Sequence, residues 1–227
     1  MSRPVRTSPT SARKRGRPAQ LSRQRIVATA LELLAAEPAK ALTMQRLARA
    51  LDAAPMALYT HVRNRADLMQ VIADTILGGI EVSVEPDDWA GTVRRWAWAL
   101  RAEFLRYPFM AQLLNEGIGT PAAWLRVSNP LLQALQQAGL RGAALADAQR
   151  WVSRVVFGSV LMELVLPAAV PEEMHGVRQA LLELPESERG TWLDILPELG
   201  RHADEDVFAY TLDRTIDALE AMSAGYK

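Results

Sequence analysis

Cysteine is absent from this chain of 227 residues, and histidine occurs only three times. The absence of cysteine excludes disulfide bonds and zinc fingers with cysteine ligands. The sequence also lacks a glycine-rich phosphate loop ending in Gly-Lys, a nucleophile elbow and a metal motif of paired histidines. His175 lies near Glu172 and Glu173, where a solvated acidic turn is favoured over a metal site. We therefore expect no catalysis, no metal and no cofactor.

Long hydrophobic runs and strand patterns are also missing. The most apolar segment, residues 144–166, is divided by Arg154 and Glu163 into pieces shorter than the roughly 20 residues that a membrane span needs. The chain opens without a signal peptide, so we expect a cytoplasmic protein with no membrane partner. No segment alternates between apolar and polar residues, which predicts an all-α protein.

Two short helical patterns separated by a break occupy residues 43–65. Thr43 suits the N-cap of the first helix. Pro55 suits the first position of the second, because its missing N–H would be unpaired there anyway. Leu58 and Val62 can face a core, so the second helix, of about eight residues, turns its other side chains outward. This layout is typical of a helix-turn-helix, although any helical hairpin would give a similar spacing.

Charge separates these two interpretations. Residues 1–65 hold 13 Lys+Arg against 3 Asp+Glu, whereas residues 66–227 hold 13 against 23. A small basic module can neutralise DNA phosphates, while an acidic remainder is repelled by DNA and so orients the protein. The sequence therefore favours a helix-turn-helix that binds double-stranded DNA.

The segment from Ser22 to Met69, about a fifth of the chain, resembles the N-terminal domain of the tetracycline-repressor (TetR) family of one-component bacterial transcription regulators. The matching features are the ALELL helix, Leu42-Thr43, Leu58-Tyr59, His61-Val62, Asn64 and Asp67-Leu68. The rest of the chain resembles the family in length, helical pattern and the segment Trp89 to Tyr107. The resemblance implies an N-terminal three-helix DNA-binding domain and a larger C-terminal helical domain for ligand binding and dimerisation.

The resemblance also implies which residues contact DNA. The residues placed against the major groove or its flanking phosphates are Thr43, Gln45, Pro55, Met56, Ala57, Tyr59 and His61. Tyr59, His61 and Arg65 are implied to hold the DNA backbone. Pro55 and Ala57 stand where the tetracycline repressor has polar base readers, so we expect a different operator. Proline and alanine can contact thymine methyl groups, and Gln45 can pair with adenine.

The first twenty residues carry basic side chains without apolar periodicity, so we expect residues 1–20 to form a disordered arm. Arg15 and Arg17 belong to an Arg-Gly-Arg-Pro core that resembles peptides lying in A·T minor grooves. A solvated tail that attracts DNA only nonspecifically remains an equal alternative. The expected division of the chain is the arm, a DNA-binding domain over residues 21–66 and an effector and dimerisation domain over residues 67–227.

Several helices are expected in the larger part of the chain. A helix over residues 65–79, capped by Asn64 with Asp67, connects the two domains and is the expected bistable element. Residues 183–206 are expected to form a loop with a helical turn near Trp192. The candidate lining of an effector pocket is Trp96, Phe104, Trp124, Phe157, Met162 and Glu163, although each also suits an ordinary core. Glu163 needs a partner, which could be Arg154, another arginine or a cationic ligand. Tetracycline is not expected.

Two helices have patterns that predict a homodimer. Residues 144–166 are apolar on nearly every side, so one face needs a partner beyond its own core. Residues 207–222 repeat apolar side chains with alternating spacings of four and three, a seam that suits helix pairing. The expected interface residues are Phe157, Leu161, Phe208, Leu212, Thr215, Leu219 and Met222. The resemblance implies the same four-helix interface, with DNA readers about 34–36 Å apart and a near-palindromic operator.

The function expected from the sequence is sequence-specific transcriptional regulation by a repressor that a small-molecule effector, of unknown identity, releases from its operator. The alternative is a helical scaffold or small-molecule carrier whose basic N-terminus binds RNA or anionic membranes without sequence preference. A helical enzyme ranks third.

Overall fold

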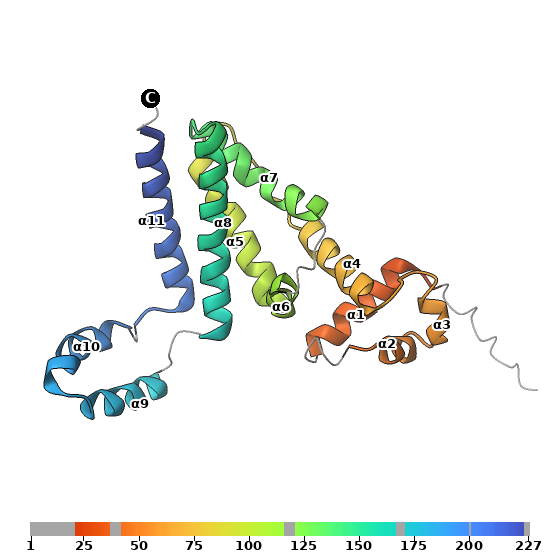
Figure 1. Ribbon diagram of the computed structural model, residues 1–227, viewed down its shortest axis with the longest axis horizontal. Helices are drawn as coiled ribbons and strands as arrows, with labels where there is room; N and C mark the ends of the chain where they lie inside the picture. The colour runs from red at the N-terminus through yellow and green to blue at the C-terminus, as the bar shows by residue number, and fades with distance from the viewer. Residues whose placement is uncertain (1–20, 37–41, 116–120, 167–170, 200, 225–227) are drawn as a thin grey trace, which may run out of the picture.

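The computed structural model describes residues 21–36, 42–115, 121–166, 171–199 and 201–224, and these residues form helices and turns without a strand. The all-α prediction is confirmed. In chain order the helices are α1 (Arg23–Ala36), α2 (Met44–Ala50), α3 (Pro55–Leu58), α4 (Arg65–Gly78), α5 (Trp89–Arg106), α6 (Phe109–Asn115), α7 (Pro121–Gln137), α8 (Gly142–Val165), α9 (Pro171–Leu182), α10 (Glu186–Leu199) and α11 (Asp204–Ala224). Figure 1 shows α1–α3 at one end of the molecule and the α5–α8 and α11 bundle at the other, joined through α4.

Thr43 caps α2 as the sequence predicts, because its hydroxyl accepts a hydrogen bond of 3.2 Å from the backbone N–H of Arg46. The helix ends in a Schellman motif. The N–H of Asp52 donates to the carbonyl of Arg49, and that of Ala53 to the carbonyl of Ala48. Asp52 has a φ of 50°, a left-handed conformation that glycine adopts more readily than aspartate. This turn sets the direction in which α3 leaves α2.

The second helix of the pair begins at Pro55 as predicted but is shorter than the predicted eight residues. It ends at Leu58, and the chain then tightens into a turn. The carbonyl of Leu58 accepts hydrogen bonds from the N–H groups of His61 (2.9 Å) and Val62 (3.0 Å). Leu58 and Val62 are both fully buried. The turn keeps Val62 in the core at the spacing that a longer helix would have given.

A reciprocal cap fixes the start of α4. The N–H of Asp67 donates to Oδ1 of Asn64 (2.8 Å), and the carboxylate of Asp67 accepts from the backbone N–H of Arg63 (2.8 Å). The backbone and side-chain hydrogen bonds from Arg63 lower the pKa of Asp67. The predicted cap at Asn64 and Asp67 is therefore confirmed.

The connecting role predicted for α4 agrees with its packing. It lies against α1 on the DNA-binding side and against α6 and α7 on the other. Leu68, Ile72 and Ile76, spaced by four, are buried together with Met69 and Leu77. These residues belong to one continuous apolar core that runs from the first helices into the larger bundle. A displacement of α6 or α7 would therefore act directly on α4, which packs against α1, and α1 in turn packs against α2.

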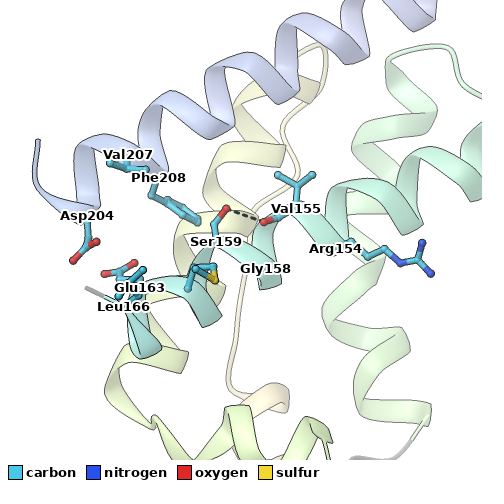
Figure 2. Close-up of a pocket in the computed structure, with 10 residues that line it drawn as sticks. Arg154, Val155, Gly158, Ser159, Glu163, Leu166, Asp204, Val207 and Phe208 are labelled. Carbon is cyan, nitrogen blue, oxygen red and sulfur yellow. Dashed lines mark hydrogen bonds between the residues drawn. The ribbon is translucent and has the colours of Figure 1, made fainter. Parts of the chain in front are cut away.

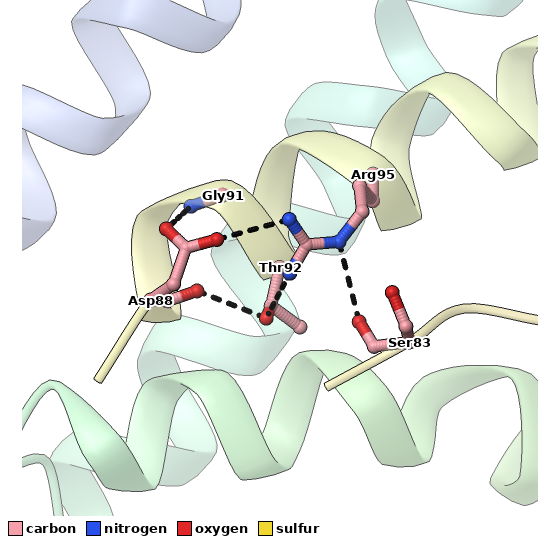
Figure 3. Close-up of polar contacts among 5 residues, drawn as sticks. All are labelled: Ser83, Asp88, Gly91, Thr92 and Arg95. Atoms are coloured by element: carbon pink, nitrogen blue, oxygen red, sulfur yellow. Dashed lines mark hydrogen bonds and ion pairs between the residues drawn. The ribbon is translucent and has the colours of Figure 1, made fainter. Parts of the chain in front are cut away.

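A polar network holds the segment between α4 and α5 (Figure 3). Asp88 is the N-cap of α5 and accepts a hydrogen bond of 2.9 Å from the N–H of Gly91. Arg95 donates to Asp88 Oδ2 (2.9 Å), Thr92 Oγ1 (3.0 Å) and the carbonyl of Ser83 (3.3 Å). The hydrogen bonds from Arg95 and then from Gly91 lower the pKa of the Asp88 carboxyl. A Cβ on Gly91 would collide with this carboxylate in its present position, so a larger residue there would require the Asp88 side chain to shift.

The remaining helices form a bundle with a separate hairpin. α5 packs against α7, α8 and α11, and α8 also packs against α7 and α11. Trp96 is 1% exposed and donates its indole N–H to the carbonyl of Val127 at 2.7 Å. Among the described residues, none of the helices combines the length and hydropathy needed to cross a bilayer. In Figure 1, α9 and α10 lie against each other and project away from the bundle.

The loop predicted over residues 183–206 is wrong, because most of it is the 14-residue helix α10. Glu186 and Glu188 stand in its first turn, where negative charge stabilises a helix. Pro197 lies within its last turn, and Leu196 is buried while Trp192 is half exposed. The acidic and proline-containing composition that suggested a loop therefore belongs to the ends of a helix. His175 lies on α9 and is exposed, rather than in the acidic turn that the sequence suggested.

Candidate DNA interface, effector domain and dimer face

The candidate DNA interface is the outer side of α2 and α3, at the end of the molecule away from the bundle (Figure 1). Met56 is 74% exposed and Tyr59 is 43% exposed, while Leu58 between them is buried. Single exposed apolar side chains are ordinary on a protein surface, so their exposure shows that they are accessible and does not by itself show a function. α3 therefore keeps its inner side in the core and leaves Met56 and Tyr59 available to a partner.

The other predicted contacts occupy the same two helices. Thr43, Gln45 and Pro55 are exposed, and Ala57 and His61 are half-buried. Thr43 and Gln45 stand at the start of α2, where backbone N–H groups have no partner within the helix and attract phosphate. The predicted set therefore lies at the N-terminal ends of α2 and α3 and in the turn after α3.

Two arginines, Arg65 and Arg49, lie at this surface, and the structure shows their positions. Arg65 is half-buried, and its Nε donates to the carbonyl of Leu42 at 3.0 Å, so it ties α4 to the entry of α2. Arg49, in the last turn of α2, is exposed beside the predicted contacts and was not assigned to them. A positive charge on the outward face of α2 could have indicated from the sequence that Arg49 belongs to the DNA interface. Arg15 and Arg17 lie outside the described residues.

Three of the predicted effector residues form an aromatic cluster. The ring of Phe157 on α8 lies 5.4 Å from the ring of Phe104 on α5 and 5.4 Å from the ring of Trp124 on α7, edge to face in both cases. Phe104 is 1% exposed, and the other two are half-buried. Edge-to-face contacts of this kind stabilise a core. Trp96 is held separately by its hydrogen bond to Val127.

Glu163 has a partner within the protomer. Arg101 on α5 donates from Nε to Oε2 (2.9 Å) and from a terminal nitrogen to Oε1 (2.6 Å), and both side chains are about one-eighth exposed, at 13% and 12%. The guanidinium also lies 5.2 Å from the ring of Trp98 and 5.5 Å from the ring of Phe208. The predicted need for a partner is met by an arginine other than Arg154.

A groove of about 450 Å³ runs between α8 and the start of α11. It is lined by Arg154, Val155, Gly158, Ser159, Met162, Glu163, Leu166, Asp204, Val207 and Phe208. Figure 2 shows Glu163 and Asp204 at one end of the groove and Arg154 at the other. Met162 is 57% exposed here, so it lies on the outer surface of α8 rather than with the aromatic cluster.

The predicted dimer interface needs correction at α11. Phe208, Leu212, Thr215 and Leu219 are at most 3% exposed in the single protomer, so they cannot contact a partner. The seam with spacings of four and three instead packs against α5 and α8 of the same chain. The periodicity identified one apolar face but not the neighbour that covers it. On α8, Phe157 and Leu161 are half-buried, and Met222 near the end of α11 is half-buried.

The faces left uncovered lie on the same two helices. On α8 the exposed large apolar side chains include Trp151 (36%), Met162 (57%) and Val165 (78%), and on α11 they are Val207 (52%) and Tyr210 (65%). The prediction that α8 is apolar beyond its own core is therefore matched by an exposed stripe.

The chain matches two models of known protein families. One, described as "Bacterial regulatory proteins, tetR family", matches residues 26–72. The other, described as "Tetracyclin repressor-like, C-terminal domain", matches residues 83–223. An HTH-type transcriptional regulator of Saccharopolyspora erythraea is 32% identical over 165 residues, which cover 72% of this chain and 68% of that protein.

Solved structures of ActR from Streptomyces coelicolor have the same arrangement of helices. Apo ActR is 26% identical and superimposes with a TM-score of 0.79 over 92% of this chain and 99% of ActR. The complex of the TetR family protein ActR with actinorhodin is 27% identical and gives a TM-score of 0.75 over 90% of this chain and 99% of ActR.

Proposed function

The chain belongs to the TetR family of bacterial transcriptional regulators, and on that premise we propose that it is a repressor that leaves its operator when a small-molecule effector binds. It is a regulator rather than an enzyme. In this proposal, residues 21–66 bind DNA, residues 67–227 bind the effector and form the homodimer, and residues 1–20 are a basic arm.

The observation that carries the DNA-binding proposal is the exposure of Met56 and Tyr59 on a helix whose other side is sealed by Leu58. We assign the contacts to Thr43, Gln45, Pro55, Met56, Ala57, Tyr59, His61 and Arg65, with Arg15 and Arg17 of the arm. Tyr59, His61 and Arg65 hold the backbone, and Gln45 reads a base. Arg65 also donates its Nε to the carbonyl of Leu42, so part of its role is structural.

The homodimer in this proposal uses the exposed faces of α8 and α11, with Trp151, Met162, Val165, Val207 and Tyr210 in place of the buried α11 residues. A two-fold pair of helix-turn-helix units places its reading helices about 34–36 Å apart, one turn of DNA. The operator is therefore expected to be near-palindromic.

The effector proposal rests on the aromatic cluster of Phe104, Trp124 and Phe157 inside the bundle. ActR, a fold relative, has been solved with actinorhodin, which supports an organic small molecule as the class of effector here. The effector must prefer a conformation in which the reading helices are misplaced. Driving the population from 1:99 to 99:1 takes roughly 10⁴-fold differential affinity, about 5.5 kcal/mol.

Selection of genomic DNA fragments by the purified protein, followed by footprinting, tests this function. A repressor enriches a near-palindromic duplex and protects two half-sites about one helical turn apart. The regulated gene next to that site would indicate the class of effector. Enrichment of no sequence, with equal binding to RNA and anionic vesicles, would instead support the scaffold or carrier.

A further inference from the structure

The side chains of α3 contain no nitrogen or oxygen atom. The helix is Pro55–Leu58, with the sequence Pro-Met-Ala-Leu. Leu58 is buried in the core, so α3 turns outward the exposed Pro55 and Met56 and the half-buried Ala57. The sulfur of methionine is only a weak hydrogen-bond acceptor. These side chains therefore cannot recognise a base through a hydrogen bond of ordinary strength.

The hydroxyl groups beside α3 already have partners within the protomer. Thr60, two residues after α3, donates its hydroxyl to the carbonyl of Ala57 at 2.7 Å. The hydroxyl oxygen of Thr43 caps α2. Among the contacts assigned above, Gln45 keeps a side-chain amide exposed on the first turn of α2. Hydrogen bonding to bases is therefore assigned to α2, and α3 is left with apolar recognition.

Thymine offers an apolar group on its major-groove edge. Adenine, guanine and cytosine present hydrogen-bond donors and acceptors there, whereas thymine also carries a methyl group on C5. Polar base atoms covered by Met56 would lose water without gaining a partner, which is unfavourable. A methyl group covered by Met56 would instead leave water favourably. 5-Methylcytosine has the same methyl group at the same ring position.

Resting on the proposed DNA-binding function, we propose that α3 recognises the C5 methyl groups of pyrimidines and that Met56 covers the methyl group. The flexible and unbranched side chain of methionine adapts to irregular apolar surfaces. Each operator half-site accordingly presents thymine opposite α3, and 5-methylcytosine is accepted in its place. At that position the protein distinguishes cytosine from 5-methylcytosine.

Replacement of thymine by deoxyuridine tests this recognition, because it removes the methyl group and keeps base pairing. The operator obtained by genomic selection is prepared as synthetic duplexes in which each symmetry-related pair of thymines is replaced in turn. Fluorescence anisotropy with the full-length protein measures the affinity for each duplex. Opposite α3 we expect a loss of roughly fourfold per methyl group, or about tenfold or more for the pair.

Substitution of Met56 identifies the residue that covers the methyl group. Met56→Ala is expected to reduce the difference between the thymine and uracil duplexes to less than about twofold, and Met56→Leu to keep it. Because Met56 is 74% exposed, neither change disturbs the core. Gln45→Ala is the matched control, since it weakens the operator complex but keeps the difference between the two duplexes. A difference that is undiminished in Met56→Ala would overturn the assignment to Met56.

Methylated cytosine provides an independent measurement at the same position. Replacement of the thymine-adenine pair by cytosine-guanine is expected to weaken binding. Methylation of that cytosine on C5 is expected to restore affinity by at least about threefold. Equal binding of the methylated and unmethylated duplexes would contradict recognition of the methyl group.

The outcomes separate this inference from the proposed function. If selection enriches an operator and no change from thymine to uracil alters its affinity by about twofold or more, α3 does not recognise methyl groups, and the proposed regulator is unaffected. Enrichment of no operator would overturn both.

Discussion

Gln45 is exposed on α2 and Tyr59 is exposed at the C-terminal end of α3, and we assign them different tasks on DNA. Tyr59→Ala is expected to weaken binding to the operator and to random DNA alike, because a phosphate contact is common to every sequence. Gln45→Ala is expected to weaken the operator complex about tenfold to a hundredfold and to relax one base position. Fluorescence anisotropy with both duplexes measures each loss, and equal losses on both duplexes for both variants would contradict the division.

Asp52 occupies a position of the α2–α3 turn that favours glycine, since its φ is 50°. Asp52→Gly is expected to raise the free energy of unfolding by about 0.5–1 kcal/mol, because it removes a Cβ from a left-handed conformation. Urea unfolding at fixed protein concentration measures the change. Asp52→Ala is the control, since it loses the same charge but keeps the Cβ. A gain of equal size in Asp52→Ala would show that charge, and not backbone conformation, limits stability here.

The ion pair between Arg101 and Glu163 joins α5 to α8 beside the aromatic rings of Trp98 and Phe208. Removing one member leaves a nearly buried charge without its partner, so Arg101→Met is expected to lower the free energy of unfolding by about 3 kcal/mol. The double variant Arg101→Met with Glu163→Met is expected to recover much of that loss. Urea unfolding at constant protein concentration gives the double-mutant cycle.

A surface pair provides the control for that cycle. Arg201 and Glu198 are bonded at 2.6 Å, but their side chains are 67% and 58% exposed. Arg201→Met is therefore expected to cost less than about 1 kcal/mol. Equal losses at the two pairs would mean that burial does not control the strength of the Arg101–Glu163 link.

The elements that the sequence predicted well are those with local signals. Thr43, Asn64 and Pro55 act within three or four residues of themselves, so the starts of α2, α3 and α4 could be placed from spacing alone. The pairing of Arg101 with Glu163 spans 62 residues and depends on how α5 meets α8, which no local pattern contains. The apolar spacing of α11 indicates that one face of the helix is buried, but it does not indicate which helix covers that face. Its residues were therefore predicted to contact a partner, although they are buried within their own protomer. α10 was missed because acidic residues and proline at helix ends resemble loop composition.

At the scale of the whole molecule, we expect the opposed charges of the two parts to influence association with DNA. A variant that begins at Ala19 loses six positively charged residues. If the arm contacts phosphates, operator affinity falls and the plot of log K against log salt becomes less steep, since its slope follows the number of phosphates neutralised. Titrations at several salt concentrations measure both quantities. A truncated protein that keeps its affinity and its slope would exclude a DNA role for the arm.

α4 is one uninterrupted helix with a cap at its start and core contacts toward both ends of the molecule. A single inserted residue in its interior would rotate everything beyond it by about 100° and advance it by about 1.5 Å. The two helix-turn-helix units of a dimer would then no longer match the DNA grooves, even with every contact residue unchanged. The length of α4 is therefore expected to matter for operator binding, as the side chains assigned to contact the operator are.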